Sequence, residues 1–376
     1  MKIVLAPDSY KGSLSANEVV KGMRQAIESL PYQDTIIEKP MADGGEGTVD
    51  ALTTASRGQK IHLTCTGPLG TPIETYYAML PDHTAVIEVA NIAGLTQVPI
   101  EKRNPDDTTS YGLGEVIRDA LDRGASSLII GLGGSATNDG GLGMLQALGM
   151  EANQQDGTKA GIYGKDLHAV KEVKLEVLDQ RLKRTSIQVA CDVANPLVGE
   201  NGASAVYGPQ KGSTENQIAQ YDQTLAQYAK LIETKQRQSY QSMEGSGAAG
   251  GLGFAMLVLG ADLVSGAKLV AEAGDLEIAI KEADLVITGE GQSDEQTLYG
   301  KAPGYIADLA NRYNTPVILL SGSLTGKQDP LRNKFAGCFS IINEPLAVET
   351  SMAKAKTLVT EQMKHIRHFI SHLKHN

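Results

Sequence analysis

Short runs of apolar residues alternate along the chain with stretches whose apolar positions repeat every three or four residues. Residues 2–6 form the first run, and a helical stripe that includes Val19, Met23 and Ile27 follows it. Ser15 precedes this stripe, with Glu18 three positions later, which is the pattern of a capping box at a helix start. A second apolar run covers residues 35–39, and a helix is expected at 48–55. The N-terminal part therefore predicts strands and helices in alternation.

The middle of the chain has a different pattern, and the alternation returns near the end. Between residues 58 and 89 apolar positions recur every second residue, with Gly-Pro and Pro-Asp pairs between the runs, which predicts antiparallel strands. Further on, Thr214 and Gln217 form a second capping-box pattern before a helix expected to reach about residue 235. Other strands are expected at 128–130, 187–191, 285–288, 317–320 and 338–342, and other helices at 111–123, 305–312 and the C-terminal end.

Because the last part of the chain resembles the first, we expect both ends to build one domain. A length of 376 residues also favours two domains over one. The predicted fold class is α/β: a Rossmann-like domain with a doubly wound parallel sheet, built from both termini, and a second, mixed α/β domain inserted into it. We place the first domain at residues 1–70 and 284–376 and the inserted domain at 71–283, with the active site in the cleft between them.

Composition narrows the class of protein. The formal net charge of -10 argues against nucleic acid as a partner. Three cysteines, far apart and in no CxxC pair, fit a reducing compartment without a disulfide framework. The first apolar run is too short for a signal peptide, and no stretch has the roughly 18 apolar residues of a membrane span. We therefore expect a cytoplasmic protein without membrane contact, either monomeric or homodimeric.

Glycines and polar residues gather directly after the apolar runs. The chain has 41 glycines, and many lie in five such loops, at residues 7–12, 41–47, 132–140, 289–294 and 321–323. The carboxyl ends of parallel strands meet at one edge of a sheet, where ligands bind in α/β proteins. These loops are therefore predicted to converge on one cleft, which favours an enzyme over a binding module.

Residues 127–149 combine an apolar run, a glycine loop and a helical pattern. Glycines let backbone N–H groups approach an anion, and a helix N-terminus favours negative charge. Gly131, Gly133 and Ala136 satisfy G-x-G-x-x-A, with Glu151 near the offset of a ribose-binding acid. This match leaves open an NAD(P)-dependent dehydrogenase of a small hydroxy acid, although the polar residues 137–139 speak against it. A non-catalytic anion-binding protein is a further alternative. The sequence contains no standard P-loop motif.

The other loops supply carboxylates and lysines. Mg²⁺ prefers one or two carboxylates together with phosphate oxygens and water, and a lysine can neutralise a phosphoryl group or a substrate carboxylate. The lysines beside glycine in such loops are Lys11, Lys211 and Lys301. The acidic residues in glycine loops are Asp8, Asp43, Glu46, Asp139, Asp192, Glu290 and Asp294.

Seven motifs in order along nearly the whole chain resemble the bacterial glycerate kinase family, type I. They are APDSYKGSLSA, PMADGGEGT, GLGGSATNDGG, ACDVANPL with GPQKG, GSGAAGGLG, ITGEGQSDEQT with GKAP, and SGS. The resemblance implies ATP-dependent phosphorylation of D-glycerate, with 2-phosphoglycerate the usual product, in organic-acid, glyoxylate or sugar-acid catabolism. Tyr10, Glu244-Gly245 and Gly304-Tyr305 depart from the family pattern without removing a polar group that we assign a role.

Phosphoryl transfer needs amides around phosphates, a metal held by carboxylates, positive charge, and a group that orients the attacking hydroxyl. We expect Asp43 to orient the 2-hydroxyl, with Asp192 the alternative base, and Lys11 to act in catalysis. The residues expected to bind glycerate are Asp8, Ser9, Lys11 and Glu46. Those expected to bind ATP are Gly133, Gly134, Ser135, Thr137, Asn138, Lys211 and Glu290. The expected Mg²⁺ ligands are Asp192, Asp294 and Asp139.

Overall fold

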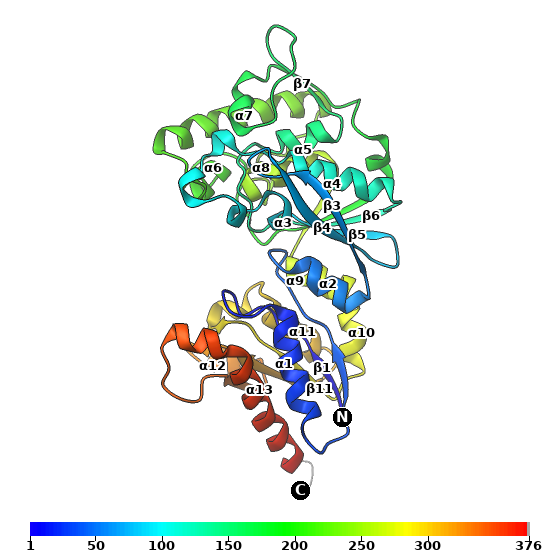
Figure 1. The fold of residues 1–376 in the computed structure, drawn as a ribbon, viewed down its shortest axis with the longest axis vertical. Helices are drawn as coiled ribbons and strands as arrows, with labels where there is room; N and C mark the ends of the chain where they lie inside the picture. Colours follow the sequence, from blue (N-terminus) through cyan, green and yellow to red (C-terminus); the bar gives the residue numbers. More distant parts are fainter. Residues whose placement is uncertain (374–376) are drawn as a thin grey trace. The chain divides into compact units, whose positions relative to one another are not determined.

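The computed structural model describes residues 1–373 (Figure 1). Contacts between residues divide the chain into two compact units. Unit 1 comprises residues 1–43, 50–58 and 267–376, and unit 2 comprises residues 44–49 and 59–266. This division differs from the predicted domain limits at residues 44–49, 59–70 and 267–283. The predicted limits of the domains themselves stay a prediction.

Unit 1 is built on a five-stranded sheet in which all neighbouring strands are parallel, in the order β15-β13-β11-β1-β2. Strands β12 and β14 form a separate two-stranded parallel sheet. The strands are β1 (Lys2–Leu5), β2 (Thr35–Glu38), β11 (Leu285–Thr288), β12 (Gln292–Ser293), β13 (Val317–Ser321), β14 (Ser323–Leu324) and β15 (Gly337–Ser340). The helices are α1 (Ala16–Glu28), α9 (Gly266–Ala273), α10 (Leu276–Lys281), η7 (Glu295–Leu298), α11 (Ala302–Asn311), α12 (Asp329–Arg332) and α13 (Val348–Leu373), and α2 (Thr48–Ser56) crosses the division between the units.

Alternating side chains give this sheet two apolar faces. Ile3 and Leu5 of β1 join a buried cluster with α1 and α13, which pack against each other along their lengths (Figure 1). Val4 is equally buried but points to the other face, because successive side chains of a strand alternate. Helix α11 contacts β11 and β13. The parallel sheet of the α/β prediction is confirmed.

Unit 2 contains a six-stranded mixed sheet in the order β10-β9-β6-β5-β4-β3. Strands β3, β4 and β5 are antiparallel neighbours, as the period-two pattern predicted, and the remaining pairs are parallel. The strands are β3 (Gln59–Thr66), β4 (Pro72–Met79), β5 (Thr84–Glu88), β6 (Ser127–Gly131), β7 (Glu151–Asn153), β8 (Glu172–Lys174), β9 (Ser186–Ala190) and β10 (Asp262–Val264). The helices are α3 (Ala90–Ala93), η1 (Leu95–Gln97), η2 (Ile100–Lys102), η3 (Pro105–Asp107), α4 (Tyr111–Asp122), α5 (Leu142–Ala147), η4 (Gly164–Ala169), η5 (Gln180–Arg184), α6 (Ala203–Tyr207), η6 (Pro209–Lys211), α7 (Glu215–Gln236) and α8 (Ala248–Val258).

Local sequence signals explain where several helices begin. Ser15 and Glu18 form the predicted capping box before α1, and Thr214 and Gln217 form the one before α7. Each box satisfies two backbone N–H groups that the helix itself leaves without a partner. None of the helices within residues 1–373 is long and apolar enough to cross a membrane.

Candidate active site

The strand order of unit 1 locates a crevice at the carboxyl edge of its sheet. The chain leaves β1 toward β2 on one side, whereas it passes from β11 through β13 to β15 on the other. Such a reversal between neighbouring strands is where open α/β sheets bind ligands. The loops after β1 and β11 run together here, because the amide of Asp8 donates to the carbonyl of Gly289 at 2.8 Å.

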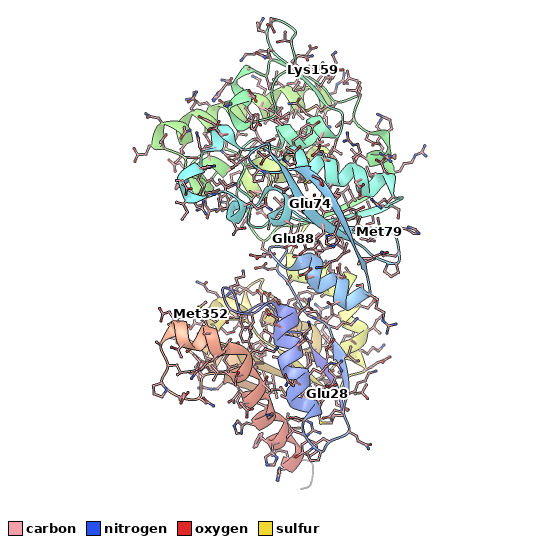
Figure 2. All side chains as sticks on the ribbon, in the orientation of Figure 1. Glu28, Glu74, Met79, Glu88, Lys159 and Met352 are labelled. Atoms are coloured by element: carbon pink, nitrogen blue, oxygen red, sulfur yellow. The ribbon has the colours of Figure 1, made fainter. Side chains whose placement is uncertain are left out.

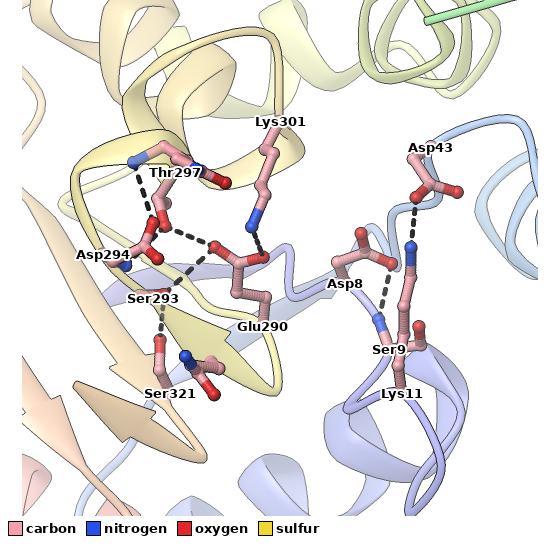
Figure 3. A network of polar contacts seen from close by, with 12 residues as sticks. Asp8, Ser9, Lys11, Asp43, Glu290, Ser293, Asp294, Thr297, Lys301 and Ser321 are labelled. Carbon is pink, nitrogen blue, oxygen red and sulfur yellow. Dashed lines mark hydrogen bonds and ion pairs between the residues drawn. The ribbon is translucent and has the colours of Figure 1, made fainter. Parts of the chain in front are cut away.

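A pocket of about 490 Å³ opens at this edge. Its polar side chains come from the loop after β1, from Asp43, and from the segments after β11 and β13. They belong to Asp8, Ser9, Tyr10, Lys11, Ser13, Asp43, Glu290, Gln292, Lys301 and Ser323, and helix α13 adds Ser351. The structure therefore brings together Asp8, Ser9, Lys11, Asp43 and Glu290 of the predicted site residues (Figure 3).

Lys11 and Asp43 form an ion pair at the mouth of the pocket. The Lys11 ammonium donates to the Asp43 carboxylate at 2.6 Å, and 74% of the Lys11 side chain is exposed (Figure 3). Burial of its inner part acts to lower the pKa of Lys11, but Asp43, Asp8 and Glu290 outweigh it and raise that pKa above its ordinary value. Lys11 therefore carries a reliable positive charge that a substrate anion can reach.

Asp8 occupies the interior of the same pocket. Its carboxylate accepts the amide of Ser9 at 2.6 Å, and only 8% of the residue is exposed. Burial, followed by repulsion from Asp43, raises the pKa of Asp8 to about 7. Asp8 can therefore accept or donate a proton near neutral pH.

Glu290 holds a network on the opposite side of the pocket (Figure 3). One carboxylate oxygen accepts the hydroxyls of Thr297 at 2.6 Å and Ser293 at 3.2 Å, and the other accepts the Lys301 ammonium at 3.0 Å. Ser293 also shares a hydrogen bond of 2.7 Å with Ser321. The network fixes Lys301 at the start of α11, where the helix N-terminus adds positive potential.

The pocket also has an apolar wall. The loop after β15 and the first turns of α13 supply Ile341, Ile342, Leu346, Val348, Met352 and Ala355. No motif in the sequence pointed to these residues, because an apolar position at the start of a helix looks the same whether it lines a pocket or the core. Lys301, which we identified only as a lysine beside glycine, is the other functional candidate that the predicted site omitted.

Asp294 follows this network but does not line the pocket. One of its carboxylate oxygens accepts the amide of Gln296 at 2.8 Å, and its own amide donates to Thr297, so it caps η7. The residue is half-buried. A half-buried carboxylate with a cap bond still suits Mg²⁺, which takes few protein ligands.

The glycine loop at residues 133–140 belongs to unit 2, and its polar residues are buried. Both oxygens of Asp139 accept protein donors: Ser110 supplies its amide and hydroxyl, and Gly141 and Gly143 supply amides. Burial raises the pKa of Asp139 although these bonds oppose the shift. Its surroundings therefore favour a structural acceptor over the predicted metal ligand. Asn138 donates to Ser204 at 3.0 Å.

Lys211 completes this buried network. Its ammonium donates to the Ser135 hydroxyl at 3.0 Å and to the Thr137 carbonyl at 2.7 Å, and the residue is 2% exposed. Burial lowers the pKa of Lys211 to about 7, although the charge of Asp139 opposes the shift. Lys211 therefore holds the loop in shape. Within the loop, Gly134 is the exposed position and Gly133 is half-buried.

The glycines of the G-x-G-x-x-A match serve packing within the chain. A Cβ on Gly131 would lie 2.4 Å from the carbonyl oxygen of Gly44, and a Cβ on Gly133 would lie 2.5 Å from the Cα of Gly45. Glu151, the predicted ribose acid, instead pairs with Lys174 at 2.8 Å across the β7–β8 pair. These contacts give the dehydrogenase interpretation no support.

Two other predicted site residues of unit 2, Glu46 and Asp192, are exposed. A buried acid of the same unit, Glu88, was not among the predicted site residues. Glu46 lies in the glycine loop that precedes α2, and the carboxylate of Asp192 accepts the amide of Gly266 at 3.0 Å. Glu88, at the end of β5, is 1% exposed and accepts the amides of Gly47 and Val49 (Figure 2). Its place at the end of an apolar run was the available signal. Among residues 1–373, His, Cys, Asp and Glu form no group of three suited to a metal ion.

Comparison with known proteins gives a consistent result. The model of the glycerate kinase family matches residues 3–371. A protein of Escherichia coli (strain K12) named glycerate 2-kinase is 47% identical over 86% of each chain, and one of Bacillus subtilis (strain 168) named glycerate kinase is 44% identical over 94% of each. A crystal structure from Salmonella typhimurium LT2, provisionally named glycerate kinase 2, matches all of both chains with a TM-score of 0.91 and 43% identity.

Proposed function

The chain belongs to the glycerate kinase family, and on that premise we propose that it transfers the γ-phosphoryl group of ATP to the 2-hydroxyl of D-glycerate. The products are ADP and 2-phosphoglycerate, and the setting is the catabolism of small organic acids. The name of the Escherichia coli relative supports the 2-position. The observation that carries the proposal is a pocket at the sheet edge in which the ion pairs Lys11–Asp43 and Lys301–Glu290 meet.

Glycerate needs a cation for its carboxylate and an acceptor for its hydroxyl proton. Lys11 supplies the cation from an exposed side chain, and Ser9 of the same loop also lines the pocket. Asp43 lies 2.6 Å from the Lys11 ammonium, so a glycerate carboxylate bound to Lys11 places its 2-hydroxyl within reach of Asp43. Asp8, which is 8% exposed, lines the same pocket.

The transfer balances with these groups. The 2-oxygen forms a bond to the γ-phosphorus, the bond from that phosphorus to the bridging oxygen of ADP breaks, and the hydroxyl proton passes to the Asp43 carboxylate. Lys301 offsets the negative charge of the transferring group from its position on Glu290. Orientation and charge neutralisation supply most of the catalysis in such a reaction, since the transition state is loose.

Two of the three predicted Mg²⁺ ligands have carboxylates that an ion can reach: Asp192 is exposed and Asp294 is half-buried. Asp294 in unit 1 and Asp192 in unit 2 each stay candidate ligands, whereas the bonds that Asp139 already accepts make that residue a poor ligand. The ion would neutralise phosphate charge when bound.

A coupled assay of ADP release tests the function. The acceptors are D-glycerate, hydroxypyruvate and tartronate, and ³¹P NMR distinguishes 2-phosphoglycerate from 3-phosphoglycerate. We expect ADP release with D-glycerate and a 2-phosphoglycerate product. If no ADP were released with D-glycerate, the proposed activity would be refuted. If the product were 3-phosphoglycerate, only the position of phosphorylation would be refuted.

A further inference from the structure

The apolar wall of the pocket has no use in binding glycerate. A three-carbon hydroxy acid presents oxygen atoms on every side, and it fills only a small part of a pocket of about 490 Å³. A volume of this size is typical of sites for larger small molecules. The wall nevertheless carries six apolar residues, Ile341, Ile342, Leu346, Val348, Met352 and Ala355.

Two of these side chains are left uncovered by the protein. Val348 is 69% exposed and Met352, which is labelled in Figure 2, is 37% exposed, and both lie in the first turns of α13. Leaving apolar surface in water is unfavourable unless a partner covers it. The wall is also anchored, because the Ser13 hydroxyl donates to the Met352 carbonyl at 2.8 Å and so ties α13 to the loop after β1.

The pocket is also lined by charged side chains. Lys11 and Lys301 face it together with Asp8, Asp43 and Glu290. Lysine ammonium groups bind phosphate oxygens as point charges. An occupant of the whole pocket must therefore combine a flat or apolar part with an anionic part.

We propose that the wall formed by Val348, Met352 and their four apolar neighbours receives the purine base of the phosphate donor, with the phosphates directed toward Lys301. This inference rests on the proposed function for the identity of the donor. The base lies against aliphatic and thioether groups, which suit an aromatic ring. The polyphosphate chain extends toward the end of the pocket where Asp43 meets the acceptor hydroxyl.

Charge placed on the wall tests this arrangement. Val348→Glu and Met352→Glu should each raise the KM for ATP at least tenfold, while kcat and the KM for D-glycerate stay within twofold of the wild-type values. Phe369→Glu is the matched control, because Phe369 is an exposed apolar residue (58%) of the same helix outside the pocket. Val348 is exposed enough that its replacement leaves the core intact, and thermal melting confirms folding of each variant.

Direct binding supplies a readout that does not depend on turnover. Isothermal titration with adenosine should give a heat of binding to the wild type that both wall variants lose and that Phe369→Glu keeps. Inorganic triphosphate, which lacks the base, should bind all four proteins within threefold of one affinity. Adenosine binding that survived in both wall variants, or a rise in the KM for D-glycerate in place of that for ATP, would overturn the inference.

The two proposals fail in different ways. A wild-type protein that binds adenosine but releases no ADP with D-glycerate refutes the proposed function and leaves the base site standing. A protein that phosphorylates D-glycerate with an unchanged KM for ATP in both wall variants refutes the base site alone.

Discussion

At the scale of single residues, the pocket is defined by charges that the fold places close together. Three carboxyl groups and two ammonium groups line it. The Lys11 side chain is largely exposed, whereas Asp8 is almost fully buried. Lys11 can therefore contact a substrate directly, whereas the buried Asp8 acts on the pocket through its charge.

Replacing either member of the exposed pair should reduce turnover by different routes. Asp43→Asn removes the proton acceptor, and we expect kcat to fall on the order of 10²-fold. Lys11→Ala removes the cation, so the KM for D-glycerate should rise on the order of tenfold or more. Steady-state kinetics with D-glycerate as the varied substrate measures both effects.

The pair Lys165–Asp107 provides the control, because it is also exposed and has a similar separation of 3.0 Å. Lys165→Ala should leave both constants unchanged. If Asp43→Asn and Lys11→Ala behaved like this control, the roles assigned to the pair would be wrong.

Asp8 should make stability depend on pH. Its pKa rises on folding from an ordinary 3.8 to about 7, so the folded state favours the protonated carboxyl. The group therefore adds stability below pH 3.8 that is lost as the pH rises through 7, up to a ceiling of about 4 kcal/mol. Asp8→Asn should melt at a higher temperature than the wild type at pH 8.5, and the difference should shrink toward pH 4.

Asp262→Asn changes an exposed carboxylate and serves as the control for this experiment. It should give the same difference from the wild type at both pH values. A constant difference for Asp8→Asn as well would show that Asp8 does not titrate in this range.

At the scale of elements, the glycine run in the first turn of α8 shapes the buried loop of unit 2. Ala249, Gly250 and Gly251 all have positive φ, and the amide of Gly140 donates to the Gly250 carbonyl at 3.0 Å. A Cβ on Gly250 would lie 2.0 Å from the carbonyl oxygen of Thr137. The run therefore lets two backbone segments approach each other more closely than any side chain permits.

An alanine in the left-handed conformation costs about 1–2 kcal/mol. Gly250→Ala should lower the free energy of unfolding by several times that amount, because its Cβ would also clash with the Thr137 carbonyl. Gly260→Ala isolates that smaller cost, since Gly260 has a φ of +84° and nothing within 4 Å of a built Cβ. Urea unfolding followed by circular dichroism compares the two. Equal losses of stability would show that the chain relaxes around the Gly250 contact.

The elements also show how far sequence reasoning reaches. The strand predicted at 317–320 is found at Val317–Ser321, because a strand buried on both faces is a continuous apolar run. The short β7–β8 pair was not predicted, since three-residue strands carry too little pattern. In the site, Asp8, Lys11 and Asp43 were predicted because they follow strands. Asp139 occurs in the same sequence context, and only the fold shows that four protein donors already surround it.

At the scale of the whole molecule, unit 1 is assembled from both ends of the chain. Asp34 accepts two hydrogen bonds from Arg367, at 2.7 and 3.0 Å, although 333 positions separate them. The N-terminal ammonium of Met1 donates to the same carboxylate at 3.0 Å. Burial acts to raise the pKa of Asp34, but Arg367 and the N-terminal amine outweigh it and lower that pKa. Distant segments are thus held together through one buried carboxylate.

Arg367→Met should therefore destabilise unit 1 far more than an ordinary ion-pair mutation. The side chains of Asp34 and Arg367 are 1% and 6% exposed, and removing one partner of a buried pair costs about 3–5 kcal/mol because the other charge stays buried. Arg332→Met, which breaks an exposed pair with Asp329, should cost less than about 1 kcal/mol. Because the pKa of Asp34 is lowered in the folded state, its contribution is present at neutral pH and is lost as the pH falls through that pKa. Melting curves should therefore show a large gap between wild type and Arg367→Met at pH 7 that narrows in acid, whereas a gap independent of pH would mean that Arg367 acts only through its packing on Tyr32.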